Sequence, residues 1–322
     1  MKRFSRLLIT AFAFVLVAGG GAPATATPSA HLGAGRPVYL ALGDSIAAGQ
    51  QSAAPVLGPD GQLDYWATVA RWKANGYVAQ FAHELREDRD CRRAGGGHER
   101  RGHDACRSLR LLNLSRSAVP AMDGQPARPG VTTQRLIDEQ LPAATTLLRQ
   151  RNGDRNRHND VEVVTLTVGG NDIFGPLTSA CLLSDPSTGC EAAVGTAFSA
   201  FTERYATVLD QLRAAAGRHT VIITMTYYNP LPYCTLGQAN PSAGAFADWV
   251  LEGGTLPQVG TLADGFNDLI RSTSQQYDAE VAETFGELGA GDFVGGADCL
   301  HPNRVGHTKL AAAFDEAFEA AR

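Results

Sequence analysis

Leu40-Ala41-Leu42-Gly43-Asp44-Ser45-Ile46-Ala47-Ala48-Gly49 joins an apolar run to a turn, and the rest of the sequence can be interpreted from this segment. The run, which begins at Val38, predicts a buried strand, and the small residues after Gly43 suit a tight turn into a helix. A serine at such a corner has its hydroxyl at the carboxyl edge of a sheet, where open α/β folds bind ligands. Its backbone N–H, near a helix N-terminus, can donate to a developing anion. Ser45 is therefore a candidate nucleophile, and an ordinary Gly-Asp-Ser turn is the alternative interpretation.

Three further segments contain small or polar residues of the kind that form sites. The β-rich residues 161–168 end in Gly169-Gly170-Asn171-Asp172, and the apolar residues 109–114 lead into Ser115-Arg116-Ser117-Ala118. Asp298-Cys299-Leu300-His301-Pro302-Asn303 stands near the C-terminus. In this order, these segments and that of Ser45 resemble the conserved blocks of the SGNH (GDSL-type) hydrolase family. The family usually has glycine at the position of Ala118, so this block departs from its pattern.

The resemblance spans most of the chain and implies a three-layer α/β/α, flavodoxin-like SGNH hydrolase fold around a central, mostly parallel sheet of about five strands. The hydrophobic pattern agrees, because apolar runs alternate with segments of helical spacing, which favours right-handed βαβ units. The expected strands cover residues 38–42, 109–114, 161–168, 219–227 and 280–285. The expected helices cover residues 77–85, 132–151 with an interruption near Pro142, 192–216, 262–277 and 308–321.

Residues 1–26 have the layout of a secretory signal peptide. Lys2, Arg3 and Arg6 precede the apolar residues 7–18, and Ala24-Thr25-Ala26 offers a small-residue cleavage site. The apolar stretch is shorter than the roughly 20 residues that a membrane span needs. We therefore expect a cleaved segment 1–26, a disordered lead-in 27–36 and a single SGNH hydrolase domain over 37–322. The protein is expected to be secreted and extracellular, with no stable membrane anchor.

The composition is mildly acidic, with a formal net charge of −5 at pH 7. Removal of residues 1–26 would take away three basic residues and no acidic ones. An acidic chain has no general attraction for phosphate backbones, so no nucleic-acid partner is expected. The protein is expected to be a monomer that needs no cofactor.

Six cysteines in an exported chain predict three disulfides, for which 15 pairings exist. Short separations favour two of the pairs, and the resemblance to secreted bacterial SGNH lipases implies the same sequential pairing. The expected pairs are Cys91–Cys106, Cys181–Cys190 and Cys234–Cys299. The third bond would tie residues 228–232 to the segment that contains Asp298 and His301.

The charged segment 86–107 also contains Cys91, His98, His103 and Cys106, which could be interpreted as a zinc site. The segment lacks a Cys-x-x-Cys pair, and the expected compartment is oxidising. A loop closed by a disulfide is therefore favoured, and no metal is expected.

A serine hydroxyl needs a base to become a good nucleophile, and His301 is the candidate base. Asp298, three residues earlier, can reach the other ring nitrogen, where it would set the tautomer and stabilise the imidazolium. His307 is the nearest competitor, and we interpret it as part of a helix entry. The resemblance implies the same catalytic roles for Ser45, Asp298 and His301.

Acyl transfer also needs donors for the oxyanion of the tetrahedral intermediate. The candidates are the backbone N–H groups of Ser45 and Ala118 and the side-chain amide of Asn171. Ala118 can donate provided that its backbone does not require positive φ. Asp44 and Asp172 are expected to hold turns through side-chain hydrogen bonds. The resemblance implies a mostly open site. Tyr233, Phe246 and Trp249, within residues 229–260, could form its acyl-binding rim, and a packed surface loop is the alternative interpretation of these residues.

These residues together predict a secreted lipase or esterase that cleaves small-molecule or lipid carboxylic esters through an acyl-Ser45 intermediate. An acyltransferase or a carbohydrate O-acyl esterase would use the same three residues. A non-catalytic ligand-binding protein on this fold and a metal-dependent hydrolase are the alternatives from other functional classes.

Overall fold

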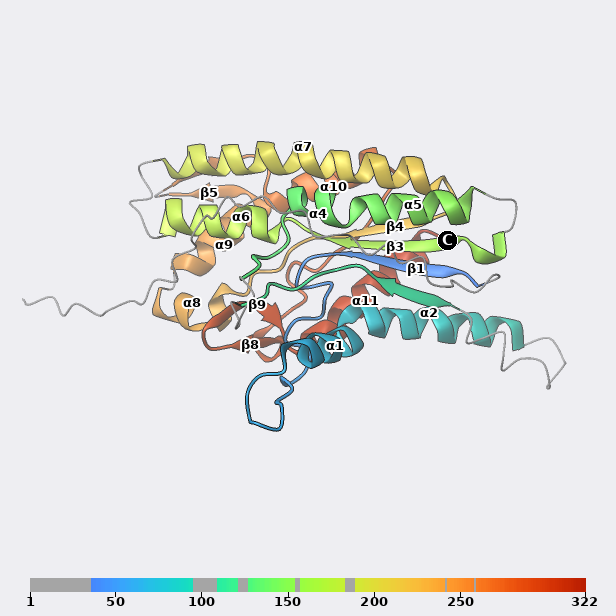
Figure 1. The fold of residues 1–322 in the computed structure, drawn as a ribbon. Coiled ribbons are helices and arrows are strands. Elements are labelled where there is room, and N and C mark those ends of the chain that lie inside the picture. Colours follow the sequence, from blue (N-terminus) through green and yellow to red (C-terminus); the bar gives the residue numbers. More distant parts are fainter. Residues whose placement is uncertain are drawn as a thin grey trace, which may run out of the picture. The chain divides into compact units, whose positions relative to one another are not determined.

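In the part of the chain that the computed structural model describes, a five-stranded parallel sheet forms the centre (Figure 1). The described residues are 36–94, 109–120, 127–153, 157–182, 189–240, 242–257 and 259–322. In spatial order, the strands are β2 (Arg110–Asn113), β1 (Val38–Gly43), β3 (Val161–Thr167), β4 (Val221–Met225) and β7 (Glu280–Ala282). Each neighbouring pair is parallel, which confirms the expected α/β class.

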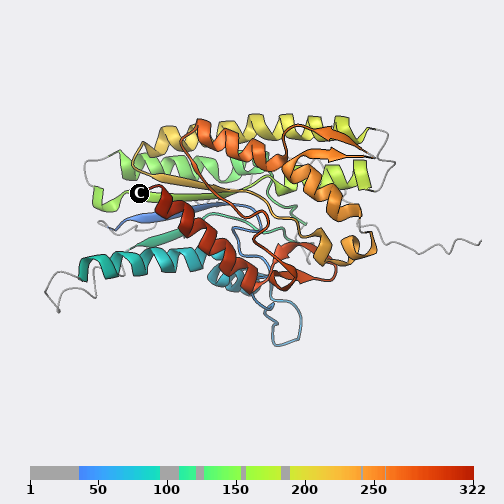
Figure 2. The ribbon, with the colours of Figure 1, turned by 180° about the vertical axis from the view of Figure 1, so that it is seen from behind.

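Helices cover both faces of this sheet and give the expected three layers (Figure 1, Figure 2). One layer contains α4 (Thr133–Glu139), α5 (Leu141–Asn152), α7 (Cys190–Ala216) and α10 (Phe266–Gln276). The other contains α1 (Tyr65–Asn75), α2 (Tyr77–Ala94) and α11 (Arg304–Ala320). This arrangement follows from the parallel pairing, because parallel strands need crossover connections that carry helices onto the faces of the sheet.

The core lies on both faces of the sheet, since both are covered by helices. Every residue of β1 is buried, and the Tyr39 hydroxyl shares a 2.8 Å hydrogen bond with Thr165 on β3. The longest helix, α7, buries residues three or four positions apart against this core. They include Val194, Phe198, Phe201, Tyr205, Val208 and Leu212. This spacing is that of one helix face, which explains why residues 192–216 could be predicted as a helix.

Additional short elements lie beyond the main sheet. They are the 3₁₀ helices η1 (Arg157–Asn159), η3 (Leu231–Tyr233) and η4 (Ala290–Asp292), the helices α6 (Gly170–Leu177), α8 (Thr235–Ala239) and α9 (Ser242–Glu252), and the π-helical turn η2 (Thr178–Leu182). Two antiparallel hairpins pair β5 (Gly254–Leu256) with β6 (Gly260–Leu262) and β8 (Phe293–Gly295) with β9 (Asp298–Pro302). Figure 1 places α6, α8, α9, β8 and β9 toward one end of the molecule.

The alternative interpretation of residues 229–260 as a surface loop is wrong, because this region contains η3, α8, α9 and the start of the β5–β6 hairpin. Phe246, Trp249 and Val250 are buried at positions i, i+3 and i+4 of α9, which is the spacing of an apolar helix face. The frequent glycines and prolines of the region obscured that spacing in the sequence. Proline and glycine mark turns, but here they separate short helices rather than extend one loop.

The expected helix directly after Ser45 is also absent from the described residues, because the chain from Ser45 to Gln51 forms consecutive turns. Gly49 has φ +69°, which ends helical propagation, and a Cβ there would lie 2.4 Å from the Trp72 carbonyl oxygen. The chain therefore turns back onto α1, a helix that the sequence pattern did not predict. A charged loop was also expected from residue 86, but α2 continues to Ala94. Arginine and glutamate favour helices, which explains the longer helix.

The structure contains the disulfides Cys181–Cys190 and Cys234–Cys299, in agreement with two of the expected pairs. The expected Cys91–Cys106 bond, the remainder of the segment 95–108 and residues 1–35 with their proposed signal peptide fall outside the description. No helix in the described part of the chain is both long and apolar enough to cross a membrane.

Candidate active site

Ser45 lies directly after the carboxyl end of β1, where the chain makes a tight turn. Gly43 has φ +141°, and a Cβ there would lie 2.3 Å from the Thr167 carbonyl oxygen, so glycine is required. The side-chain amide of Gln140 accepts from the Gly43 N–H at 2.9 Å and donates to the Gly43 carbonyl at 2.8 Å. These contacts hold the start of the turn, and Ser45 is 9 % exposed at its apex.

Asp44 is buried beside Ser45 and organises the same turn. Its carboxylate accepts from the Ile46 N–H at 2.9 Å and from the Tyr227 hydroxyl at 3.2 Å. Burial raises the pKa of Asp44 to about 6, although these hydrogen bonds and the neighbouring His301 oppose the rise. The contacts agree with the structural role expected for Asp44. Asp172 also has a structural contact, because it accepts from the Thr133 N–H at 2.9 Å and so connects α6 to the start of α4.

His301 and Asp298 lie on β9, and His301 reaches Ser45 across 256 positions of sequence. His301 Nε2 lies 2.9 Å from Ser45 Oγ, and His301 Nδ1 lies 2.9 Å from Asp298 Oδ2. Asp298 Oδ1 also accepts from the N–H groups of Leu300 and His301, each at 3.0 Å. Burial would raise the pKa of Asp298, but the hydrogen bonds and charge of His301 and the backbone donors lower it to about 2. An ionised carboxylate therefore faces the imidazole, which can accept a proton from Ser45.

Asn171 lies in the first turn of α6, after Gly169 with φ +130°. Its Nδ2 donates to the Val131 carbonyl at 3.0 Å, and an amide nitrogen has a second hydrogen with which it can donate to another acceptor. Gly130 makes this position possible, because a Cβ there would lie 2.4 Å from Asn171 Oδ1. Asn171, Ser45 and His301 line the same cavity, so the structure brings these three candidates together.

Ala118 lies in the segment after β2 and does not line that cavity. Its carbonyl accepts from the Tyr65 hydroxyl at 2.8 Å, and its φ is not positive, so alanine fits without strain. Lys73 also holds this segment, since its ammonium donates to the carbonyls of Asn113 and Ser115 at 3.2 and 2.7 Å. Burial, followed by repulsion from Arg116, lowers the pKa of Lys73 to about 8.

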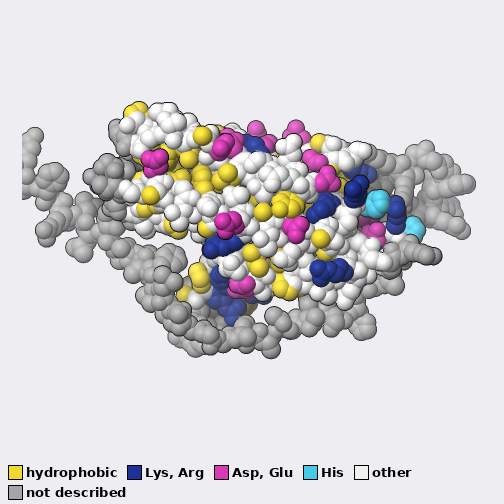
Figure 3. Space-filling model, turned by 90° about the horizontal axis from the view of Figure 1, so that it is seen from above, with side chains coloured by type: hydrophobic (Ala, Val, Ile, Leu, Met, Phe, Trp, Pro, Cys, Tyr) yellow, Lys and Arg dark blue, Asp and Glu magenta, His cyan; other side chains and the backbone are white. Residues whose placement is uncertain are grey.

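The cavity beside Ser45 is lined mainly by apolar side chains. They include Ile173, Phe174 and Leu177 of α6 and Phe246, Val250 and Leu251 of α9. Two apolar walls, one from α6 and one from α9, therefore line the cavity beside Ser45. Figure 3 shows hydrophobic side chains gathered toward the left of that view, the side where Figure 1 places α6 and α9.

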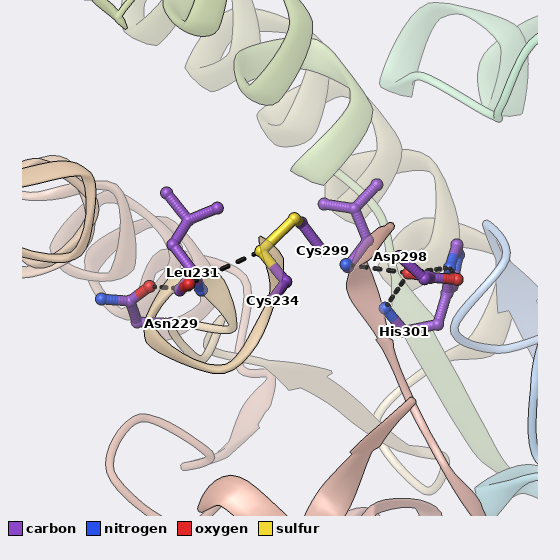
Figure 4. The surroundings of a disulfide bond; sticks show 7 residues. Asn229, Leu231, Cys234, Asp298, Cys299 and His301 are labelled. Atoms are coloured by element: carbon purple, nitrogen blue, oxygen red, sulfur yellow. Dashed lines mark hydrogen bonds and ion pairs between the residues drawn. A yellow bond between two sulfur atoms is a disulfide. The ribbon is translucent and has the colours of Figure 1, made fainter. Parts of the chain in front are cut away.

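Only one of the three aromatic residues expected at the rim lines this cavity, namely Phe246. Tyr233 stacks on Phe293 with ring centroids 5.3 Å apart, and the Trp249 indole donates to the Gly254 carbonyl at 3.1 Å. Both of these residues therefore support the surrounding elements. The Cys234–Cys299 bond connects the end of η3 to β9, next to Asp298 (Figure 4).

His307 is fully buried at the start of α11. Its Nδ1 accepts from the Tyr77 N–H at 3.4 Å, and its Nε2 donates to the Gln50 carbonyl at 3.3 Å. Burial lowers the pKa of His307 to about 4, despite the hydrogen bond to Gln50. A neutral imidazole thus joins two segments, which agrees with the structural role expected for this histidine.

Sequence reasoning missed three residues that support the site: Gln51, whose amide contacts Asp298, and Tyr227 and Gln140, which contact the turn of Ser45. Each lies outside the recognised segments, and its partner is at least 97 positions away. Among the described residues, no group of three or more His, Cys, Asp or Glu side chains could hold a metal ion.

Comparison with known proteins relates the chain to one family. The GDSL-like Lipase/Acylhydrolase family model matches residues 41–309. No curated protein matches the chain.

Solved structures with a similar arrangement include the lipase Lip_vut3 from a goat rumen metagenome, which is 17% identical with a TM-score of 0.46 and aligns over 87% of this chain and 97% of its own. Phospholipase A1 from Streptomyces albidoflavus NA297 is 16% identical with a TM-score of 0.47, over 88% and 99% of the two chains. The extracellular lipase from Streptomyces rimosus is 16% identical with a TM-score of 0.47, over 87% and 99%.

Proposed function

The chain belongs to the GDSL-like Lipase/Acylhydrolase family and is a carboxylic ester hydrolase, and we propose that it acts through a covalent acyl-Ser45 intermediate. The observation that carries this proposal is the continuous contact from Ser45 Oγ through the His301 ring to the Asp298 carboxylate. Such an arrangement activates a serine hydroxyl, because the imidazole can take its proton while the carboxylate stabilises the resulting imidazolium.

In the first half of the reaction, His301 Nε2 takes the Ser45 proton while Ser45 Oγ attacks the ester carbonyl carbon. The C=O bond becomes a C–O⁻ single bond in a tetrahedral intermediate. This intermediate collapses to acyl-Ser45, and the leaving alkoxide takes the proton from His301. In the second half, His301 deprotonates a water, which attacks the acyl carbon. Ser45 then leaves with the proton, and the carboxylic acid is released.

The oxyanion of each tetrahedral intermediate would accept hydrogen bonds from the Ser45 N–H and from Asn171 Nδ2. Support comes from the common cavity that Ser45 and Asn171 line and from the second Nδ2 hydrogen of Asn171. Ala118 N–H is a third candidate, supported by an unstrained backbone. Preorganised donors of this kind are worth about 10²–10³ in rate each.

The acyl chain of the substrate would occupy the apolar cavity between α6 and α9. Its lining supports lipid or aryl esters with an extended acyl group over acetylated sugars, because apolar walls favour apolar ligand surface. Transfer of the acyl group to an alcohol instead of water would use the same acyl-Ser45 intermediate.

We also propose that residues 1–26 direct export and that 37–322 form the hydrolase domain, which acts outside the cell as a monomer without nucleic acid. The two disulfides support the first part, since disulfides persist in oxidising compartments. Mass determination of the secreted protein would show whether cleavage follows Ala26.

The proposed mechanism can be tested by hydrolysis of p-nitrophenyl esters from acetate to palmitate. Ser45→Ala should abolish activity, whereas Ser272→Ala should leave it unchanged, since Ser272 is exposed on α10. EDTA should have no effect on the wild type. Activity in Ser45→Ala would overturn the nucleophile, and loss with EDTA would favour a metal-dependent hydrolase. Absence of hydrolysis on every ester, including sugar acetates, would favour a non-catalytic ligand-binding protein.

A further inference from the structure

The carboxylate of Asp298 has a hydrogen-bond partner from a distant part of the chain. Gln51 Nε2 donates to Asp298 Oδ2 at 3.3 Å, across 247 positions of sequence. The other hydrogen-bond donors to this carboxylate among the described residues are the backbone of Leu300 and the backbone and ring of His301. Leu300 and His301 lie on the same strand as Asp298, so Gln51 is the donor among the described residues that connects this carboxylate to another part of the fold.

The backbone of Gln51 adopts a conformation that glutamine normally avoids. Its φ is +68°, and Asp278 is the other non-glycine residue with positive φ in the described part of the chain. Such a conformation is unfavourable and persists only where the surroundings impose it. The positive φ directs the Gln51 side chain out of the turn and toward Asp298 on β9.

Neighbouring contacts impose this conformation from both sides. The Gln50 N–H donates to the Ser45 carbonyl at 2.9 Å, and the Gln50 carbonyl accepts from buried His307 at 3.3 Å. On the other side, the Ser52 N–H donates to the Gly49 carbonyl at 2.9 Å, and its hydroxyl donates to the Trp72 carbonyl at 3.0 Å. Gln51 is thus held between two anchored residues.

These contacts form a closed circuit around the proposed site. Ser45 contacts His301, His301 contacts Asp298, and Asp298 contacts Gln51. Gln50, which precedes Gln51, donates its backbone N–H to the Ser45 carbonyl and so closes the circuit. The turn that carries the nucleophile is therefore connected to β9 at two points, through Ser45 and through Gln51.

We propose that Gln51 is a positioning residue for the reaction, and that its side-chain amide holds the Asp298 carboxylate in the orientation that receives the His301 ring. The proposal rests on the proposed function of Ser45, His301 and Asp298. Gln51 lies outside the substrate cavity, so it acts through Asp298 on the position of His301 Nε2 and affects the rate rather than substrate affinity.

Two substitutions separate positioning from stability. Gln51→Gly removes the amide and relieves the backbone strain, because glycine adopts positive φ freely. We expect kcat for p-nitrophenyl butyrate to fall about 10- to 100-fold, the range in which small misplacements of catalytic groups reduce rates. KM should stay within twofold, and Tm should be unchanged or higher.

The matched control is Asp278→Gly, which relieves the same kind of strain at an exposed position after α10. Its Tm should also be unchanged or higher, and its kcat should equal that of the wild type.

Gln51→Glu places a negative charge next to Asp298 in place of the amide donor. The added carboxylate is opposite in charge to the imidazolium of His301 and therefore favours the protonated ring, so the acid limb of the kcat/KM profile should move about one unit to higher pH. Gln51→Gly should not produce that shift. If Gln51→Gly keeps wild-type kcat, or Gln51→Glu keeps the wild-type pH profile, Gln51 has no positioning role.

A readout without substrate distinguishes this proposal from the proposed function. The downfield proton NMR signal of His301 Nδ1–H should exchange with water faster in Gln51→Gly than in the wild type or Asp278→Gly. An unchanged signal would overturn the role of Gln51 even if the protein hydrolysed no ester. Activity retained in Ser45→Ala would overturn the mechanism while leaving the NMR result valid for the contact.

Discussion

The hydroxyl of Tyr227, which follows β4, donates a 3.2 Å hydrogen bond to the carboxylate of Asp44, immediately before Ser45. Tyr227 also contacts the backbone of the Asn171 segment, since a Cβ on Gly170 would lie 2.9 Å from its ring. One buried phenol therefore packs against both the turn of the proposed nucleophile and the segment of the proposed oxyanion donor. The contact between Tyr227 and Asp44 helps to hold the site in place, and it depends on pH because Asp44 is titratable.

Asp44 should make stability depend on pH in the acidic range. Its pKa is raised from 3.8 to about 6 in the folded protein. The folded protein binds this proton more tightly than the unfolded chain does, so protonation of Asp44 stabilises the fold. This stabilisation is complete below pH 3.8, falls as pH rises, and is absent above about pH 6. Wild type should therefore lose about 2 kcal/mol relative to Asp44→Asn between pH 4 and pH 7, at 1.36 kcal/mol per pKa unit.

Urea unfolding of both proteins at several pH values measures this difference. Asp210→Asn is the control for the loss of one carboxylate, because Asp210 is exposed on α7. A difference between wild type and Asp44→Asn that stays constant from pH 4 to pH 7 would contradict the raised pKa.

Gly130→Ala should impair catalysis without contacting the substrate. The added Cβ would lie 2.4 Å from Asn171 Oδ1, so the amide must move away from its position in the cavity that Ser45 also lines. We expect kcat to fall by about 10²-fold, as for loss of one oxyanion donor. Gly175→Ala is the control, since a Cβ there meets no atom within 4 Å and alanine favours the helix α6. Equal kcat values for the two variants would exclude Asn171 as a donor.

Val250→Trp should shorten the preferred acyl chain. Val250 lines the apolar cavity from α9, and a tryptophan would occupy space that we assign to the acyl chain. We expect kcat/KM for p-nitrophenyl octanoate and palmitate to fall at least tenfold, as for the loss of about 1.4 kcal/mol of binding. The value for acetate should change little. Val305→Trp, at an exposed position of α11, should preserve the whole chain-length profile. A parallel loss for acetate and palmitate in Val250→Trp would place the acyl chain elsewhere.

Removal of the Cys234–Cys299 bond should have a greater effect than removal of Cys181–Cys190. The first bond closes a sequence separation of 65 and the second a separation of 9, and the entropic stabilisation rises with loop length. Replacing both cysteines of the first pair by alanine should cost about 2–4 kcal/mol in urea unfolding. It should also lower kcat, because Cys299 is adjacent to Asp298 on β9. Equal stability losses in the two double variants would contradict the loop-length argument.

Several parts of the fold could be predicted because their signals are local. The apolar runs that form β1, β2 and β3 end in turn residues, and the spacing of Phe198, Phe201 and Tyr205 is visible within α7. The fold of residues 229–260 could not be predicted, because short helices separated by proline and glycine do not produce a long periodic pattern. The helix α1 was missed for a related reason, although Asp64 is an N-cap that accepts from the Ala67 N–H.

The sequence by itself determined the class of fold and the candidate residues Ser45, Asn171, Asp298 and His301, because short segments encode strand ends, tight turns and reactive side chains. The tertiary structure decided the partners of these residues. Contacts such as Gln51 with Asp298, Tyr227 with Asp44 and Gly130 with Asn171 depend on how strands and helices align after packing. No local pattern encodes that alignment, since burial of the whole core selects it, and the two apolar walls of the cavity arise in the same way.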